Sequence, residues 1–155
     1  MKKKLGFTII ELLIVIALIA IITAVALPNL YGRKNTNDLK NTITQIGILL
    51  RQAQSDAMLQ EGGFSWGVHF QNSTNTAPYY ALFSASSSAE NISSYYRLPS
   101  DVGYMSSTLP IGSSLDISFS PILGATTSTS VSLYLLNQPS QVMTISIAST
   151  GAVSY

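Results

Sequence analysis

One carboxylate lies in a stretch of sequence that is otherwise apolar. Glu11 falls within residues 7–27, FTIIELLIVIALIAIITAVAL, where the other polar groups are hydroxyls. A charged side chain near the centre of a lipid bilayer costs about 2.5 to 3.5 kcal/mol, and less near the interface. Such a carboxylate needs a partner of opposite charge. Pairing with an amine in an apolar medium is therefore the chemistry to which Glu11 is suited.

Side chains for catalysis or metal binding are sparse. His69 is the sole histidine and the chain has no cysteine, so scattered carboxylates would have to complete any zinc or Cys-His site. The P-loop and H-E-x-x-H motifs are absent from the sequence. We predict no enzyme activity, no catalytic residue, no metal site and no cofactor. His69 is interpreted as a structural or surface residue of a strand.

The apolar stretch around Glu11 predicts a membrane helix. Its length corresponds to about 30 Å of helix, the thickness of one bilayer core. Lys2 to Lys4 precede it, and the positive-inside rule places them in the cytoplasm and the rest of the chain outside. The stretch exceeds the apolar part of a secretory signal peptide and ends at Pro28 instead of a small-residue cleavage site. A plain single-pass anchor is the other ordinary reading, and it leaves Glu11 unexplained.

This N-terminal pattern resembles the class III signal of type IV pilins and type II secretion pseudopilins. The shared features are a short basic leader ending in Gly6, then Phe7, then Glu11 four residues later, an unbroken apolar helix, and Pro28 after it. The resemblance covers Lys2 to about Leu30. It implies that a membrane-embedded prepilin peptidase cuts between Gly6 and Phe7 and N-methylates the new Phe7 amine.

The resemblance also implies a role for Glu11 in assembly. In a fibre, the Glu11 carboxylate of one subunit would face the Phe7 amine of a neighbour, so that two charges poorly tolerated in an apolar medium are paired. The alternative is a carboxylate at the membrane interface that binds only water or its own amine. In pilins the helix near the proline can melt on entry into the fibre, which makes Pro28 and Gly32 the candidate break positions. A simple kink at the membrane exit accounts for Pro28 and Gly32 equally well.

Beyond this weak point the periodicity changes twice. Residues 31–61 show the apolar stripe of an amphipathic helix. The stripe consists of Leu39, Ile43, Ile46, Leu50, Ala53 and Ala57. Gly62 and Gly63 are expected to end this helix. Residues 62–155 then alternate with a period of two, which predicts antiparallel strands with one buried face.

Six short segments of this region predict strands. They are Ser65–Phe70, Tyr79–Phe83, Leu115–Phe119, Val131–Leu135, Val142–Ile147 and Ala152–Tyr155, with Tyr95–Leu98 and Val102–Met105 as two weaker candidates. Gly151 supplies positive φ for a tight turn between the last two strands. Within the pairs Tyr79-Tyr80 and Tyr95-Tyr96, one ring is expected to face inward and the other outward.

The C-terminal half resembles the GspH/FimT-type minor pseudopilins. The segments that carry this resemblance are ISFSPILG, VSLYL and MTISIASTGAVSY, together with LLRQAQSDAMLQ and SWGVHF. The absence of cysteine departs from the many pilins that close a C-terminal loop with a disulfide.

The charge of the chain argues against nucleic acid as a partner. Loss of the leader removes three of eight basic residues and leaves five against seven acidic ones. Beyond Gly62 the charged residues are Glu90, Arg97, Asp101 and Asp116. A DNA-binding competence pilin needs a basic patch to neutralise phosphates, and Arg97 alone does not supply one.

Together these features predict an α+β protein with a pilin-like fold. Residues 1–6 form a cleaved leader, 7–30 a transmembrane assembly helix, 31–61 the amphipathic half of the same helix, and 62–155 an antiparallel β-sheet domain. The resemblance implies a minor pilin or pseudopilin of a type IV pilus or type II secretion system. Its partners would be other such subunits in a homo- or heteropolymer, the peptidase and an inner-membrane assembly platform. It would reside in the inner membrane with its C-terminal domain outside, and then in the fibre. The alternatives are a DNA-binding competence pilin and an adhesive or ligand-binding tip.

Overall fold

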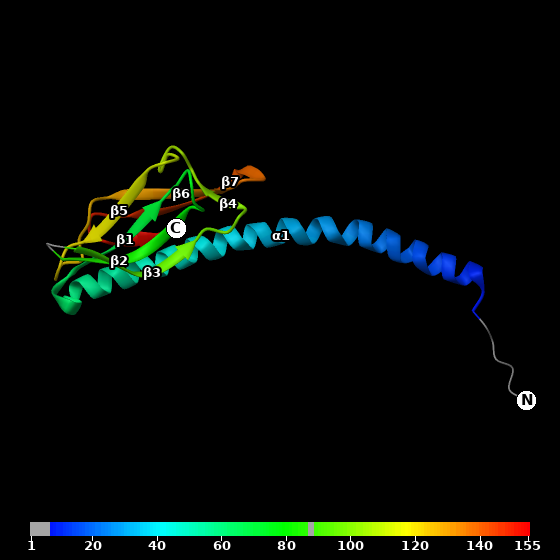
Figure 1. Ribbon diagram of the computed structural model, residues 1–155, viewed down its shortest axis with the longest axis horizontal. Helices are drawn as coiled ribbons and strands as arrows, with labels where there is room; N and C mark the ends of the chain where they lie inside the picture. Colours follow the sequence, from blue (N-terminus) through cyan, green and yellow to red (C-terminus); the bar gives the residue numbers. More distant parts are fainter. Residues whose placement is uncertain (1–6, 87–88) are drawn as a thin grey trace, which may run out of the picture. The chain divides into compact units, whose positions relative to one another are not determined.

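The computed structural model describes residues 7–86 and 89–155, with residues 25–33, 86, 89 and 90 placed only as parts of their helix or strands. The chain divides into two compact units, Met1–Lys34 and Asn35–Tyr155. One α-helix, α1 (Ile9–Met58), contributes to both units (Figure 1). The predicted weak points Pro28 and Gly32 lie outside the residues described in full, and a break at either position stays a prediction.

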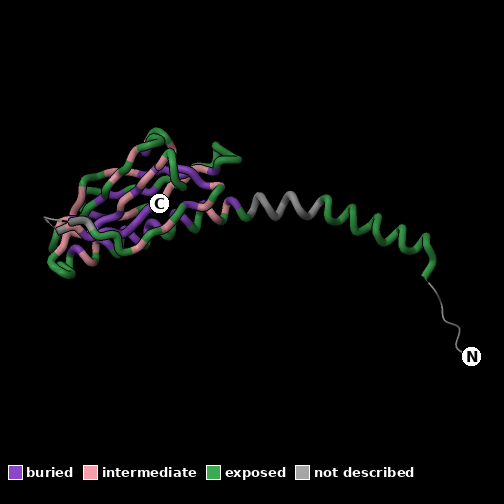
Figure 2. Tube along the Cα trace, in the orientation of Figure 1, coloured by how far each residue is buried: buried purple, intermediate pink, exposed green. Residues whose placement is uncertain are grey.

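The helix of the first unit exposes apolar side chains all round. Every residue from Phe7 to Ala24 is exposed, including the large aliphatic side chains from Ile9 to Ile22 (Figure 2). A helix that is apolar on every face is ordinarily buried in a protein core or a membrane. Among the residues described in full, no helical stretch meets the length and apolarity needed to cross a membrane.

The helix of the second unit buries one stripe. All six apolar residues of the predicted stripe are buried, from Leu39 at 2% exposure to Ala57 at 0%. This part of the prediction is confirmed. Thr42 is also buried, and its hydroxyl donates a hydrogen bond to the Asp38 carbonyl at 2.7 Å. It therefore adds no unsatisfied polar group to the buried face.

The helix ends earlier than the glycine pair predicts. α1 stops at Met58, and Gln60 takes the left-handed conformation with φ 53°. A short 3-10 turn, η1 (Glu61–Gly63), follows, in which Gly62 has φ 65° and Gly63 has φ 72°. The two glycines therefore reverse the chain toward the first strand, and the helix cap itself is made by a non-glycine residue.

In the described part of the chain, eight strands form two antiparallel sheets. The first sheet has the order β3-β2-β1-β5 and the second β4-β6-β7-β8, so the β domain that the sequence predicted comprises two sheets (Figure 1). The strands are β1 (Ser65–Gln71), β2 (Tyr79–Ser86), β3 (Ala89–Arg97), β4 (Val102–Tyr104), β5 (Ser114–Phe119), β6 (Thr129–Leu135), β7 (Gln138–Ile147) and β8 (Val153–Ser154).

The strand predictions are close, with two differences. All eight segments contain a strand, but β3 begins at Ala89 and β7 at Gln138, each several residues before the predicted start. The extra residues of β7 are exposed as far as Gln141 and include no large apolar side chain, so they carry no apolar alternation. Gln138 faces Leu135 of β6, and the register then shifts before Val142 faces Tyr134.

The helix stripe and both sheets share one apolar core. Val68 and Phe70 reach it from β1, and Leu133 and Ile145 from the second sheet, all at 0% exposure. Figure 2 shows the buried positions concentrated in these strands and in the part of α1 that belongs to the same unit. The α+β prediction is therefore confirmed, with a helix packed on antiparallel sheets.

Candidate assembly site

Thr8 caps the N-terminus of α1. The backbone N–H of Glu11 donates to Thr8 Oγ1 at 3.3 Å, and the Thr8 hydroxyl in turn donates to Glu11 Oε2 at 3.5 Å. The segment Thr-Ile-Ile-Glu places a hydroxyl at the N-cap and a glutamate three residues later, which is the arrangement of a capping box. A negative side chain here also faces the positive end of the helix dipole.

This cap was not predicted from the sequence. The predicted partners of Glu11 were a neighbour's amine, water or the chain's own amine, whereas the structure gives Glu11 a hydrogen bond with Thr8. The signal was present as threonine three residues before glutamate at the start of an apolar run. Glu11 is thus placed in the first helical turn for a structural reason, which is separate from any role of its charge in assembly.

The other residues of the predicted site lie in front of this turn or beyond it. Phe7 immediately precedes the cap and is 75% exposed. Gly6, the other residue of the predicted cleavage site, lies outside the described residues, and cleavage between the two stays a prediction. The cap therefore brings Phe7 and Glu11 to the same end of the helix, with the carboxylate itself exposed.

A histidine and a carboxylate contact each other on the exposed face of the first sheet. His69 Nδ1 lies 2.5 Å from Asp116 Oδ1, directly across the β1–β5 ladder. The His69 ring also lies 5.7 Å from the Tyr79 ring, which lies 4.5 Å from the ring of Tyr95. Within the described part of the chain, no three metal-binding side chains lie together. His69 is accordingly a surface residue held by its neighbours in the sheet.

The inner tyrosines fasten the first sheet to the rest of its unit. Tyr80 is 1% exposed and donates its hydroxyl to Gln45 Oε1 of α1 at 2.8 Å, and Tyr104 donates to the Tyr79 carbonyl at 3.0 Å. Burial, with a smaller contribution from Tyr96, raises the pKa of Tyr80 to about 12. Burial likewise raises the pKa of Tyr104. Both hydroxyls therefore act as neutral donors, and the predicted in–out division of each tyrosine pair is confirmed.

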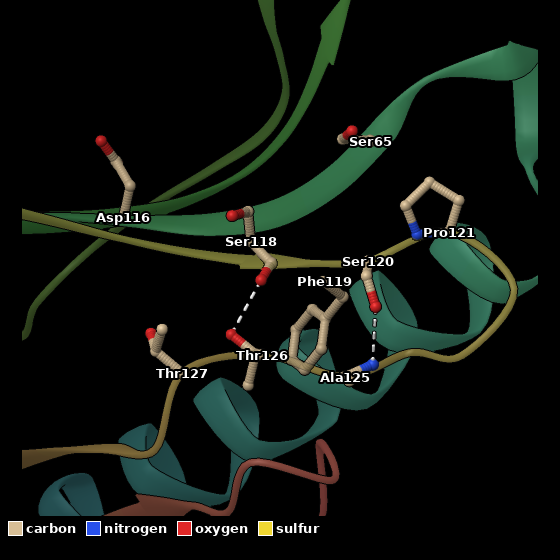
Figure 3. A pocket seen from close by; sticks show the side chains of 9 residues that line it. All are labelled: Ser65, Asp116, Ser118, Phe119, Ser120, Pro121, Ala125, Thr126 and Thr127. Carbon is tan, nitrogen blue, oxygen red and sulfur yellow. Dashed lines mark hydrogen bonds between the residues drawn. The ribbon is translucent and has the colours of Figure 1, made fainter.

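A groove of 460 Å³ lies along the free edge of β5 (Figure 3). Hydroxyls line much of it, but two of them are engaged in the protein itself. Thr126 Oγ1 donates to the Ser118 carbonyl at 2.8 Å, and Ser120 Oγ accepts from the Ala125 N–H at 3.1 Å. Asp116, the carboxylate of the groove, pairs with His69. The lining therefore offers hydrogen bonds without an assembled acid, base and nucleophile.

Comparisons with known proteins bear on the N-terminal segment. Residues 1–27 match the family described as the prokaryotic N-terminal methylation motif. A 39-residue stretch is 62% identical to the type IV wide pilus major component PilA4 of Thermus thermophilus, over 24% of this chain and 30% of that protein. The chain thus aligns with about three tenths of that curated relative. No solved structure matches significantly.

These matches confirm the resemblance of the N-terminal segment to type IV pilins. The methylation motif ends at residue 27, so it includes Phe7 and Glu11 and stops short of the sheets. Neither comparison distinguishes the GspH/FimT type from other pilins, and that finer assignment stays a prediction. The similarity is to a structural component of a fibre, so it also agrees with the absence of a predicted enzyme activity.

Proposed function

We propose that this chain is a structural subunit of a type IV pilus or a related pseudopilus. The observation that carries the proposal is the exposed apolar helix of residues 9–24. Thr8 caps its first turn, Glu11 lies in that turn, and both residues belong to the methylation motif. Such a helix is unstable in water and requires lipid or neighbouring helices around it. Membrane storage followed by bundling in a fibre supplies both environments in turn.

Processing of the N-terminus would prepare the subunit for assembly. In the first proposed step, prepilin peptidase removes residues 1–6 and methylates the amine of Phe7. The Glu11 carboxylate then pairs with the Phe7 amine of a neighbouring subunit, which removes an uncompensated charge from the apolar bundle. The exposure of Phe7 at 75% and the presence of Glu11 one turn further along support this pairing.

Location and partners follow from the same proposal. Before assembly, residues 7–30 would lie in the inner membrane with the second unit outside, as the N-terminal lysines indicate. Other pilin subunits would be the principal partners, and the inner-membrane assembly platform would extract the helix. Pro28 and Gly32 remain the proposed positions at which the helix yields during that step.

The experiment is mass spectrometry of the chain recovered from sheared, purified fibres. We expect a mature form that begins at Phe7, lacks residues 1–6 and carries one added methyl group on its amine. A Gly6→Val variant serves as the control, because it should retain the leader and stay in the membrane fraction. Absence of the parent chain from fibres, or an intact leader on the fibre form, would contradict the proposal.

A further inference from the structure

A short loop after β5 presents two large apolar side chains to solvent. Ile122 is 69% exposed and Leu123 is 77% exposed, and both lie in the loop Ser120–Ala125, here called the apolar loop. Ile122 has φ 67°, a conformation that β-branched residues rarely adopt because the side chain crowds the backbone. A strained residue persists only where the surroundings enforce it, and such residues gather at binding sites.

The apolar loop is fixed at its base. The N–H of Ser120 donates to the Ala125 carbonyl at 2.8 Å, and the N–H of Gly124 donates back to the Ser120 carbonyl at 2.9 Å. Gln54 of α1 donates its side-chain amide to the Gly124 carbonyl at 3.1 Å. The loop therefore holds its exposed side chains in a fixed position, which reduces the ordering cost of binding.

A pocket at the other end of the first sheet has the complementary character. This end pocket has a volume of 200 Å³ and is lined by residues that include Leu98, Val102, Tyr104, Ile111 and Leu136. An apolar protein cavity of about 150 Å³ accommodates a benzene molecule, so the end pocket has room for one aliphatic side chain. Ile111 and Leu136 are more than half exposed and extend the apolar lining outward.

Two polar side chains of the end pocket already have partners inside the protein. The Asn72 side-chain amide donates to the Leu109 carbonyl at 2.8 Å, and the Tyr104 hydroxyl donates to the Tyr79 carbonyl. An occupant is therefore not required to supply hydrogen bonds to these groups. An uncharged, apolar side chain is the occupant that loses least on entering.

Loop and pocket lie at opposite ends of the same strands. β5 runs from Ser114, near the end pocket, to Phe119, immediately before the apolar loop. The loop lies at the end of this unit where α1 terminates, and the pocket lies at the end where β4 and the β6–β7 hairpin are found (Figure 1). One surface of the chain is thus complementary to a different surface of the same chain, which is the condition for a head-to-tail contact that repeats without closing.

We propose that the apolar loop of one copy inserts Leu123 into the end pocket of the next copy, and that Ile122 packs against the exposed apolar lining outside the pocket. This inference rests on the proposed function, because a fibre brings many copies of the chain together. The contact links the second units of neighbouring copies and adds to the bundling of the N-terminal helices. Its occupant is a second copy of this chain.

Paired cysteines test the contact directly, because the natural chain contains none. Fibres carrying Ile111→Cys together with Leu123→Cys should form a ladder of covalently joined multimers on mild oxidation, whereas either single variant should not. The matched control is Ile92→Cys with Leu123→Cys, because Ile92 is 57% exposed on β3 and lies outside the end pocket. A ladder that is equally strong in the control overturns the inference, and so does an Ile111→Cys, Leu123→Cys chain that stays monomeric in intact fibres.

A second variant separates this inference from the subunit role itself. Leu123→Ser should lower the amount of the chain in fibres several-fold while leaving the thermal unfolding midpoint of the purified chain unchanged. Normal incorporation of Leu123→Ser overturns the contact between the apolar loop and the end pocket and leaves the subunit role intact. Failure of the unmodified chain to enter fibres overturns the subunit role, and the contact with it.

Discussion

Two substitutions at the start of α1 separate the structural role of Glu11 from its electrostatic role. Thr8→Val removes the hydroxyl that accepts the Glu11 N–H at 3.3 Å, but it leaves the carboxylate in place. Glu11→Gln removes the charge but keeps a side-chain oxygen that can take part in a capping box. Loss of a threonine cap costs about 1 kcal/mol of helix stability. Loss of a charge partner in an apolar medium costs about 2 to 3 kcal/mol, since the remaining amine is left uncompensated.

These magnitudes predict different outcomes for helix content and for assembly. Thr8→Val should fray the first turn, which lowers helix content slightly and fibre yield by roughly fivefold at 1 kcal/mol. Glu11→Gln should lower helix content only slightly, through the lost interaction with the helix dipole, and lower fibre yield by roughly 30-fold or more at 2 kcal/mol. Circular dichroism of the purified chain in micelles measures the first quantity, and quantitative immunoblotting of sheared fibres measures the second. Thr8→Ser, which keeps a hydroxyl, is the matched control.

The reverse ranking would refute the reasoning. If Glu11→Gln assembles as well as the parent chain while Thr8→Val does not, Glu11 is needed as part of the cap and its charge has no role in assembly. Equal losses accompanied by equal loss of helix content lead to the same conclusion. Membrane insertion of all variants, measured by fractionation, confirms that each chain reaches the site of assembly.

Three further predictions concern the second unit and are measured as unfolding free energies of the purified chain. Leu50→Ala, at a fully buried position, should cost about 2 to 5 kcal/mol, whereas Ile48→Ala, at 58% exposure, should change stability by less than about 0.5 kcal/mol; equal effects would contradict the assigned helix face. Gly151→Ala should cost about 1 to 3 kcal/mol, because φ is 84° and a Cβ would collide with the Gln54 side chain; an unchanged midpoint would show that the turn relaxes freely. The pKa of Tyr80 is raised to about 12, so between pH 10 and 12 the unfolded chain loses the phenol proton while the folded chain keeps it. The free energy of unfolding should therefore fall as pH rises from 10 to 12, by up to about 3 kcal/mol. Tyr80→Phe should lessen that slope, and an identical slope would contradict the assignment.

Local patterns in the sequence predicted much of the fold. Ile43 and Leu50 recur at helical spacing, and both prove fully buried. Alternation correctly predicted that one ring of the pair Tyr79-Tyr80 faces inward, and that ring is Tyr80, because side chains on a strand point to opposite faces in turn. Gly151 was correctly assigned to a tight turn with positive φ, where a residue without Cβ is not strained.

Features that depend on distant pairing were not predicted. The division into two sheets follows from which strands pair, and β1 pairs with β5 although β2, β3 and β4 intervene in the sequence. No local pattern encodes that choice. The cap at Thr8 is encoded in the local sequence, but the apolar residues around it were interpreted only as a membrane helix. The left-handed backbone at Ile122 could not be predicted from the local sequence either, because glycine and asparagine adopt this conformation far more often than isoleucine does.

The two stretches of α1, before residue 25 and from Asn35 onward, differ in what covers their apolar side chains. From Asn35 onward the helix needs only one apolar stripe, because the sheets of its own unit cover that stripe. Before residue 25 the side chains are apolar on every face, and none of the residues described in full covers them. Under the proposed function this stretch is a surface for neighbouring subunits, and the partner of the Glu11 carboxylate would set their alignment. A chain built to fold alone would gain stability from a polar residue on the exposed faces, whereas a chain built to bundle would lose it. Lysine substitutions at single positions between Leu12 and Ile22 should accordingly impair assembly while leaving the second unit folded.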